Sequence, residues 1–303
     1  MLDTSGLRGL DPTDHLHALS IVSKTQNRLQ AQALQEAIHA LRGRQFARAE
    51  QIAASILRTA KTDRAALMVY AHALLAQQRA GEAVAPLEKA ALRGPDPELE
   101  MLLGAALCES RRAADGIALL RKTAARRPPF LPAFQELAGR LAKSGRLGEA
   151  IGIIEEALAL TPDSVDLKLD LGRLCLQANQ RARARDNFAA AREAAPGRPD
   201  ILIELAWVLF LDGDYAEAAG TYKHALGLRP EDTQTRANLA MCLMELGDRA
   251  GAEAALRTIM RGRPHLLSRA AYTMAVSSHG RFFFRPSDAA RFLGADGAGA
   301  IKP

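Results

Sequence analysis

Aromatic residues are scarce in this chain of 303 residues: Phe, Trp and Tyr together make up 5%, with a single Trp. A β-sandwich, a barrel or a conventional enzyme core uses more large rings, so we expect small and aliphatic side chains to do most of the packing. Hydrophobic residues at 48% and charged residues at 24% exclude a disordered or collagen-like chain. The length fits one large domain, two ordinary domains or an elongated body without a central core.

Long apolar runs are also absent. The longest, residues 201–211, is interrupted by Glu204 and is shorter than the roughly 20 residues that cross a bilayer. The first 14 residues contain Asp3, Asp11 and Asp14 and no apolar core of a secretory signal. We therefore expect no transmembrane segment and a cytoplasmic location.

Lysine is rare, because 8 of the 40 basic residues are Lys and 32 are Arg. This bias is more typical of a GC-rich genome than of a binding site, and the net charge of +6 permits an anionic partner without requiring one. The run Arg181, Arg183 and Arg185 spreads around a helix and lies close to Asp186 and Glu193. We interpret it as solvated surface and expect no specific nucleic-acid binding.

Cysteines and enzyme motifs are few or missing. Cys108, Cys175 and Cys242 are too scattered for a disulfide scaffold or a zinc site, and we expect them to be small buried or half-buried residues. The sequence contains no phosphate-binding loop of the GxxxxGK[ST] type, no GxSxG and no HExxH. We expect no catalytic residue, no cofactor and no metal, and therefore no enzyme.

Prolines reveal an internal period. They recur at intervals of 34 residues, at Pro128, Pro162, Pro196, Pro230 and Pro264. Two apolar patterns of helical period precede each one, and a proline cannot continue a helix because it lacks the backbone N–H. The repeating unit is therefore a helix, a turn, a second helix and a stop.

Within each unit, small and large residues alternate at fixed positions. With the proline at position 32, five repeats follow one another, the first of them beginning at residue 97. Each has a large residue at position 7 and Gly or Ala at position 8. Position 20 is again small and position 24 is large. In the repeat 165–198, for example, positions 8, 20 and 24 are Gly172, Ala184 and Phe188. The small residues let the two helices approach closely, while the large ones fill the space beside them.

This pattern resembles the tetratricopeptide repeat, a helical hairpin of 34 residues. The match is good at Ala218, Tyr222 and Pro230 and poor at position 4, where Lys168 and Arg236 replace a large aromatic residue. The resemblance implies an all-α fold, a right-handed superhelical solenoid of antiparallel helix pairs with a C-terminal capping helix.

The resemblance also divides the chain. Residues 1–29 form an N-terminal arm and leading helix, 267–280 a capping helix, and 281–303 a basic and aromatic tail in which Ser287 is expected to cap a short helix. Between them, residues 30–266 hold about seven repeats: 30–63, 64–96, 97–130, 131–164, 165–198, 199–232 and 233–266.

A candidate binding groove follows from the same resemblance, because in this family the first helix of each hairpin lines a concave surface. The matching positions are Met68, His72, Met101, Leu169, Arg173, Leu176, Ile203, Trp207, Phe210, Leu211, Met241 and Met244. Aromatic and Met side chains suit a hydrophobic peptide or an amphipathic helix. Two other interpretations stay open: contact with the next repeat, or cover by the chain's own C-terminal tail.

The tail carries the strongest local feature, Arg281, Phe282, Phe283, Phe284 and Arg285. Three consecutive Phe cannot all face one side of a helix or strand. The motif predicts docking to a partner, an interfacial membrane anchor, or a fold-back that plugs the solenoid end or the groove.

Together these features predict a non-catalytic scaffold or adaptor that holds a peptide or helix of another protein. Two alternatives use the same surfaces. One is an accessory or regulatory subunit of a partner enzyme that modifies other molecules, and the other is a chaperone for hydrophobic secreted or membrane clients.

Overall fold

The computed structural model describes residues 28–260, 264–277, 279–280 and 285–294, which are helical throughout and contain no strand. A first helix spans residues 28–42. The helices after it are α2 (Phe46–Thr59), α3 (Arg64–Ala76), α4 (Ala80–Ala91), α5 (Pro97–Glu109), α6 (Ala113–Ala124), α7 (Leu131–Lys143), α8 (Leu147–Leu160), α9 (Val165–Gln177), α10 (Arg181–Ala194), α11 (Pro199–Leu211), α12 (Tyr215–Leu228), α13 (Thr233–Glu245), α14 (Arg249–Met260), η1 (Pro264–Leu266), α15 (Leu267–Val276) and α16 (Pro286–Leu293).

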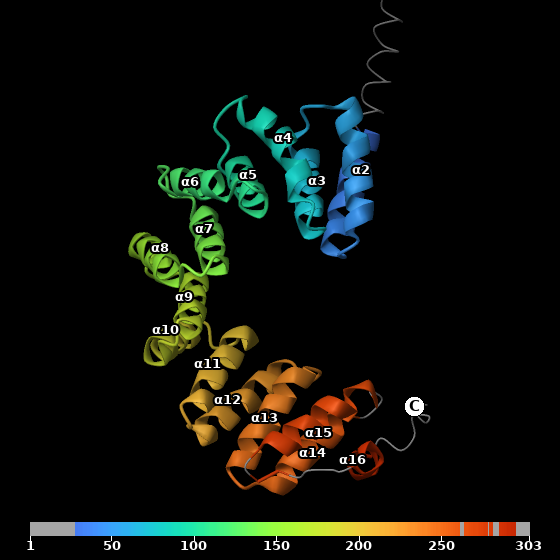
Figure 1. The fold of residues 1–303 in the computed structure, drawn as a ribbon, viewed down its shortest axis with the longest axis vertical. Coiled ribbons are helices and arrows are strands. Elements are labelled where there is room, and N and C mark those ends of the chain that lie inside the picture. The colour runs from blue at the N-terminus through green and yellow to red at the C-terminus, as the bar shows by residue number, and fades with distance from the viewer. Residues whose placement is uncertain (1–27, 261–263, 278, 281–284, 295–303) are drawn as a thin grey trace, which may run out of the picture. The chain divides into compact units, whose positions relative to one another are not determined.

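The chain forms two compact units, Met1–Leu141 and Ala142–Pro303, each of which is described by itself. Within each unit, successive helices pack as antiparallel pairs joined by short turns (Figure 1). The first helices of neighbouring repeats also touch: α3 contacts α5, and α11 contacts both α9 and α13. Packing against sequence neighbours is the organisation of a repeat protein and confirms the expected all-α fold of paired helices.

Four of the first helices begin at a side-chain cap, whereas α11 starts after Arg198 without one. Asp63, Asp96, Ser164 and Asp232 accept hydrogen bonds from backbone N–H groups in the first turns of α3, α5, α9 and α13. The second helices α2, α4, α6, α8, α10 and α12 start without such a bond. The beginning of these repeats is therefore fixed locally, since an N-cap satisfies donors that the helix leaves free.

The turn inside the hairpin has a left-handed residue at position 15 of six repeats. The residues with positive φ there are Arg44, Gln78, Gly145, Asn179, Gly213 and Gly247. Arg44 and Gln78 stand at position 15 of the repeats 30–63 and 64–96. These two repeats therefore have the same turn as the later repeats. Three of the six are glycines, for which this conformation costs little.

Close helix contacts confirm the predicted role of the small residues. A Cβ added to Gly172 at position 8 would lie 2.4 Å from Cε1 of Phe188, which is fully buried. A Cβ on Gly104 would lie 2.7 Å from Cγ of Leu120, and one on Gly116 would lie 2.6 Å from Sγ of Cys108. The two helices of these hairpins approach so closely that a methyl group does not fit.

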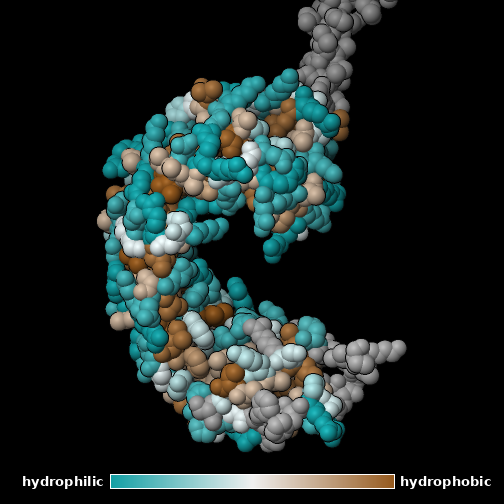
Figure 2. All heavy atoms as spheres, in the orientation of Figure 1, coloured by the Kyte–Doolittle hydropathy of each residue, from teal (hydrophilic) through white to brown (hydrophobic). Residues whose placement is uncertain are grey.

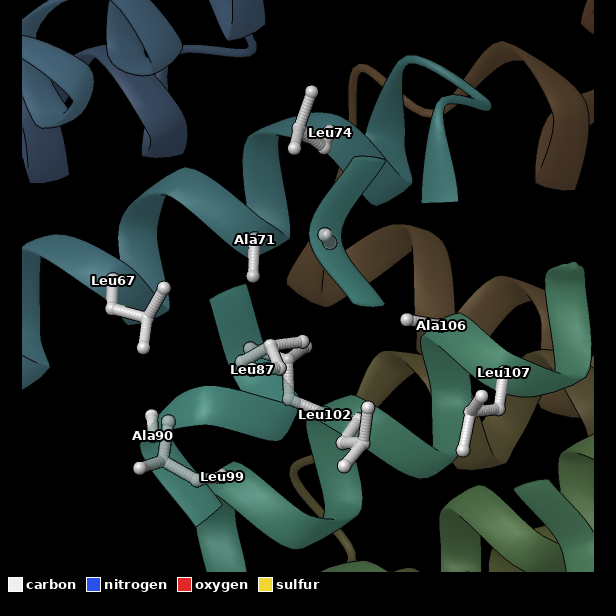
Figure 3. Packing of buried hydrophobic residues seen from close by; sticks show 11 residues of the cluster. Leu67, Ala71, Leu74, Leu87, Ala90, Leu99, Leu102, Ala106 and Leu107 are labelled. Carbon is white, nitrogen blue, oxygen red and sulfur yellow. The ribbon is translucent and has the colours of Figure 1, made fainter. Parts of the chain in front are cut away.

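Alanine and leucine make the core, as the low aromatic content predicts. In the first unit, α3, α4 and α5 contribute a cluster whose side chains converge between the helices (Figure 3). Its labelled members are Leu67, Ala71, Leu74, Leu87, Ala90, Leu99, Leu102, Ala106 and Leu107. In the second unit, Phe188 and Tyr222 at position 24 are the largest fully buried side chains.

Arginines join neighbouring helices through ion pairs. One largely enclosed pair is Arg126 with Glu100, whose side chains are 28% and 12% exposed, and Thr123 adds a hydroxyl to the same carboxylate. Arg64 pairs with Asp96 and with Glu98 of the next repeat. The planar guanidinium suits such two-point contacts with carboxylates.

The run Arg181, Arg183 and Arg185 lies at the surface, as expected, and its side chains also make specific contacts. Arg181 donates to the carbonyl O of Leu211 at 2.8 Å, and Arg185 pairs with Asp214 at 2.6 Å. Arg183 pairs with a glutamate of α8. The side chains of α10 thus reach helices before and after it, which accounts for their alternation around the helix.

The C-terminal helices pack onto the last repeat. Helix α15 contacts α13 and α14, while α16 contacts α14 and α15. Nδ1 of His279 lies 3.0 Å from the carbonyl O of Met244, and the guanidinium of Arg257 lies 5.0 Å from the ring centroid of Phe292. These contacts cover the end of the array, as terminal units of a repeat protein do.

Helix α16 begins at Pro286 with Arg285 as its N-cap, so the expectation that Ser287 caps it was wrong. Proline is favoured at the first helical position because its missing N–H has no partner there. Residues 281–284 of the tail motif lie outside the described residues.

Candidate functional site

A stack of aromatic rings marks the surface of α11. Trp207 and Phe210 lie one turn apart with ring centroids 5.5 Å from each other and planes only 11° apart. Tyr215, at the start of α12, extends the stack, with its ring 5.3 Å from Phe210 and tilted by 58°. All three residues are half-buried. Tyr215 was not among the expected site residues, although an aromatic residue four positions after the end of α11 is visible in the sequence.

Apolar side chains surround the stack on adjacent helices. Ile203 and Leu211 are half-buried on α11, Leu176 on α9 and Met241 on α13. Because α11 contacts both α9 and α13, these predicted residues belong to one continuous part of the second unit. Where Figure 1 places α11 to α13, hydrophobic spheres emerge between hydrophilic ones in Figure 2. We call Leu176, Ile203, Trp207, Phe210, Leu211 and Met241 the aromatic surface.

Two predicted groove residues lie in the interior instead. Leu169 is 3% exposed and Met244 is 0% exposed. Met244 is at the end of α13, the helix that α15 covers, and its backbone carbonyl faces His279. In this structure both side chains serve packing, which is one of the alternatives that the sequence left open.

A charged side chain next to the aromatic surface, Arg173, is neutralised by carboxylates. Nε of Arg173 on α9 lies 2.7 Å from Oε1 of Glu204 on α11, and NH1 lies 3.8 Å from Asp170. The Arg173 guanidinium therefore ties two first helices together and forms a polar edge. Because Arg173 is already paired, it does not act as a free cation that would select an acidic ligand.

The remaining predicted groove residues belong to the first unit. Met68 is half-buried and His72 exposed on α3, and Met101 is half-buried on α5, which contacts α3. Met68 also packs against the leucine and alanine core of this unit. Desolvation by surrounding helices lowers the pKa of His72, against an opposing effect of Glu136 and Glu98.

The cysteines lie where the sequence placed them. Cys175 and Cys242 are buried, and Cys108 is half-buried. Burial raises the pKa of Cys108 and of Cys175, and it raises the pKa of Cys242 to about 12. Because the thiolate is the reactive form, these thiols are poor nucleophiles in the folded chain.

In the described part of the chain, His, Cys, Asp and Glu side chains form no group of three or more that could hold a metal ion. Among the same residues, no helix is both long and apolar enough to span a membrane.

Family comparisons agree with the geometry. Models of the tetratricopeptide repeat match residues 34–99, 141–202 and 209–275, which together make up more than half of the chain. The chain belongs to the tetratricopeptide repeat family. Proteins built from these repeats are generally scaffolds for protein–protein interaction, because stacked hairpins present extended surfaces.

Individual relatives share only parts of the chain. Protein FlbA of Caulobacter vibrioides is 34% identical over 120 residues, which are 40% of this chain and 20% of FlbA. The chain thus spans about a fifth of the length of this curated relative.

One solved structure supports the fold. The structure of PilF from Pseudomonas aeruginosa matches with a TM-score of 0.53 and 20% identity, over 66% of this chain and 91% of that one. A MamA structure from AMB-1 matches with a TM-score of 0.46 and 22% identity, over 53% of this chain and 95% of that one.

Proposed function

We propose that the chain is a non-catalytic scaffold or adaptor and that its aromatic surface binds a peptide or an amphipathic helix of another protein. The observation that carries the proposal is the stacked, half-exposed pair of Trp207 and Phe210. Trp is among the residues that dominate binding energy at protein interfaces. A stacked pair also holds its rings in one arrangement before a partner arrives, which lowers the entropic cost of binding.

The neighbouring helices fit the same ligand. An amphipathic helix places apolar side chains three and four residues apart, and the aromatic surface presents half-buried apolar side chains on α9, α11 and α13. Met241 adds a flexible side chain that can repack around partners of different shape. The Arg173–Glu204 pair on the border stays available for polar contacts at the rim.

Capture of partners from the native cell tests the proposal. Wild-type chain and the double variant Trp207→Ala, Phe210→Ala are immobilised, and bound proteins are quantified by mass spectrometry. Each truncation removes a ring that would be a binding anchor, so we expect at least one partner to be lost by about tenfold or more. The helical circular dichroism of the variant should remain that of the wild type.

A matched control separates binding from stability. Tyr272 and Leu228 are exposed apolar residues outside the aromatic surface, 68% and 43% exposed. The variant Tyr272→Ala, Leu228→Ala should retain the partner. Equal capture by all three proteins would refute the aromatic surface, and loss of helical structure in the first variant would assign its rings to the core.

A further inference from the structure

An apolar hollow of about 550 Å³ lies in the first unit, on the faces of α2, α3 and α4. It belongs to the second helices α2 and α4, with α3 between them, and it shares no residue with the aromatic surface. Its apolar lining consists of Ala54, Leu57, Leu67, Tyr70, Ala85, Pro86 and Ala90. Figure 3 shows two of these, Leu67 and Ala90, on α3 and α4.

Four cations complete the lining of the hollow. Arg58 lies in the last turn of α2 and Lys89 in the last turn of α4, and Lys61 and Arg93 each follow two residues after the end of these helices. All four are exposed, and the lining contains no carboxylate. We call these residues and the apolar lining the cationic hollow.

The four cations differ from the paired arginines of this unit, although Arg42, Arg111 and Lys122 of the same unit are unpaired among the described residues as well. Arg64, Arg79 and Arg112 each pair with carboxylates of a neighbouring helix or turn. None of the four cations of the hollow makes a hydrogen bond or an ion pair with a described residue. Favourable positions near helix C-termini explain their sign, because the helix dipole prefers cations there. The dipole does not explain why the lining of this hollow contains no carboxylate.

A second, more polar hollow adjoins the first. It has a volume of about 270 Å³, shares Leu67, Ala90 and Arg93 with the first, and is otherwise lined by Thr62, Arg64, Gly94, Pro95, Asp96 and Leu99. Leu92, at the end of α4, is 87% exposed. It lies seven residues after Ala85, about two helical turns, and therefore on the same face of α4.

We propose that the cationic hollow binds an acidic amphipathic segment of a partner protein. The apolar side chains of that segment enter the hollow, and its carboxylates pair with Arg58, Lys61, Lys89 and Arg93. Charge complementarity selects the acidic ligand, since four unpaired cations would repel a basic one. The mostly aliphatic lining selects a peptide over a nucleic acid, which binds through stacked bases and phosphates.

This second site goes beyond the proposed function of the aromatic surface. The two surfaces lie in different units of the chain and differ in charge, because Arg173 at the aromatic surface is already paired. A failure of one therefore leaves the other untouched, and variants of each can be measured in the background of the other.

Selection from a display library of random amphipathic peptides tests the proposal on the full chain. Peptides that bind wild type are selected against the rim variant Arg58→Glu, Lys61→Glu, Lys89→Glu, Arg93→Glu, then sequenced and synthesised. The expected peptides carry an excess of Asp and Glu with apolar residues at helical spacing. Their affinity for the rim variant should fall about tenfold to a hundredfold, from four charge contacts of ordinary strength.

A charge-matched control isolates the position of the cations from their number. Arg42, Arg111, Lys122 and Lys223 are exposed and make no hydrogen bond or ion pair with a described residue. Their replacement by Glu changes the net charge from +6 to −2, as the rim variant does, because each substitution removes one positive and adds one negative charge. Peptide affinity for this control should stay within about twofold of wild type, since its charges lie outside the hollow.

A further variant tests the apolar part of the hollow. Ala85 is an exposed residue of α4 within the lining, and Ala85→Trp fills the space that the peptide would occupy. Ala182 on α10 is exposed and lies outside the hollow, so Ala182→Trp is its control. Peptide binding should be lost in the first and kept in the second.

The contrary results are equally concrete. Selected peptides without an excess of acidic residues, or equal affinity for the rim variant and the charge-matched control, would overturn the proposal. Vesicles of phosphatidylglycerol and a single-stranded oligonucleotide are measured in parallel. If the rim substitutions abolish binding to one of these while no acidic peptide is selected, the hollow serves a lipid surface or a nucleic acid instead.

Discussion

Gly172→Ala should destabilise the chain, although alanine is the better helix former. A Cβ at this position would lie 2.4, 2.6 and 2.9 Å from Cε1, Cδ1 and Cζ of Phe188. Ordinary contacts between carbon atoms are about 3.5 to 4 Å, so the overlap is about 1 Å. Phe188 is 0% exposed and cannot turn its ring into solvent.

The magnitude follows from two opposing effects. Overpacking a closed core costs about 1 to 3 kcal/mol, while Ala in place of Gly gains up to about 1 kcal/mol in a helix. We expect a net loss of about 1 to 2 kcal/mol in the free energy of unfolding, and a fall in Tm of about 2 to 8 °C for a unit of this size. Urea and thermal unfolding followed by circular dichroism measure both quantities.

Gly220→Ala is the matched control, because a Cβ at Gly220 on α12 meets nothing within 4 Å. Here only the helix preference changes, so this variant should be more stable than wild type by up to about 1 kcal/mol. Both variants gain the same helix preference, so the difference between their free energies of unfolding reports on packing alone.

A second substitution should rescue the first. Phe188→Ile together with Gly172→Ala reproduces the pair Ala138 and Ile154 of another repeat. The double variant should lose less stability than the two single variants together, by about 1 kcal/mol or more. If Gly172→Ala stabilises the chain as Gly220→Ala does, the close approach of the two helices is refuted.

Two further predictions concern thiols and ion pairs. In a thiol titration of the native chain, Cys108 should react first, while Cys175 and Cys242 react only on unfolding, because burial keeps them protonated and inaccessible; rapid modification of all three would contradict this. Arg126→Ala should cost about 1 to 3 kcal/mol in urea unfolding, since it leaves the largely enclosed Glu100 without its cation. Arg183→Ala, which breaks the exposed ion pair between α10 and α8, should cost less than about 1 kcal/mol. Equal costs of Arg126→Ala and Arg183→Ala would refute the role of burial.

The hairpins were predictable from the sequence because backbone chemistry determines them. A proline every 34 residues must follow a helix end, and Gly172 opposite Phe188 signals a close approach before any coordinate is known. These rules act within one repeat. They therefore operate on residues whose spacing along the chain is short and regular.

Contacts between repeats were harder to predict. The burial of Met244 depends on how α15 packs against α13, and nothing in the repeat pattern records that contact. The pairing of Arg185 with Asp214 likewise depends on which way two long side chains turn. The cationic hollow forms between helices of neighbouring repeats, so its lining residues share no periodic signature in the sequence.

The central claim is that a partner segment covers the aromatic surface, and Trp207 reports on it directly because it is the only Trp in the chain. A tryptophan-free binding segment of a captured partner is titrated into the chain while the emission of Trp207 and its quenching by acrylamide are followed. The account predicts a saturable blue shift and weaker quenching as the half-exposed ring becomes covered. Saturable binding by calorimetry with emission and quenching unchanged would contradict it.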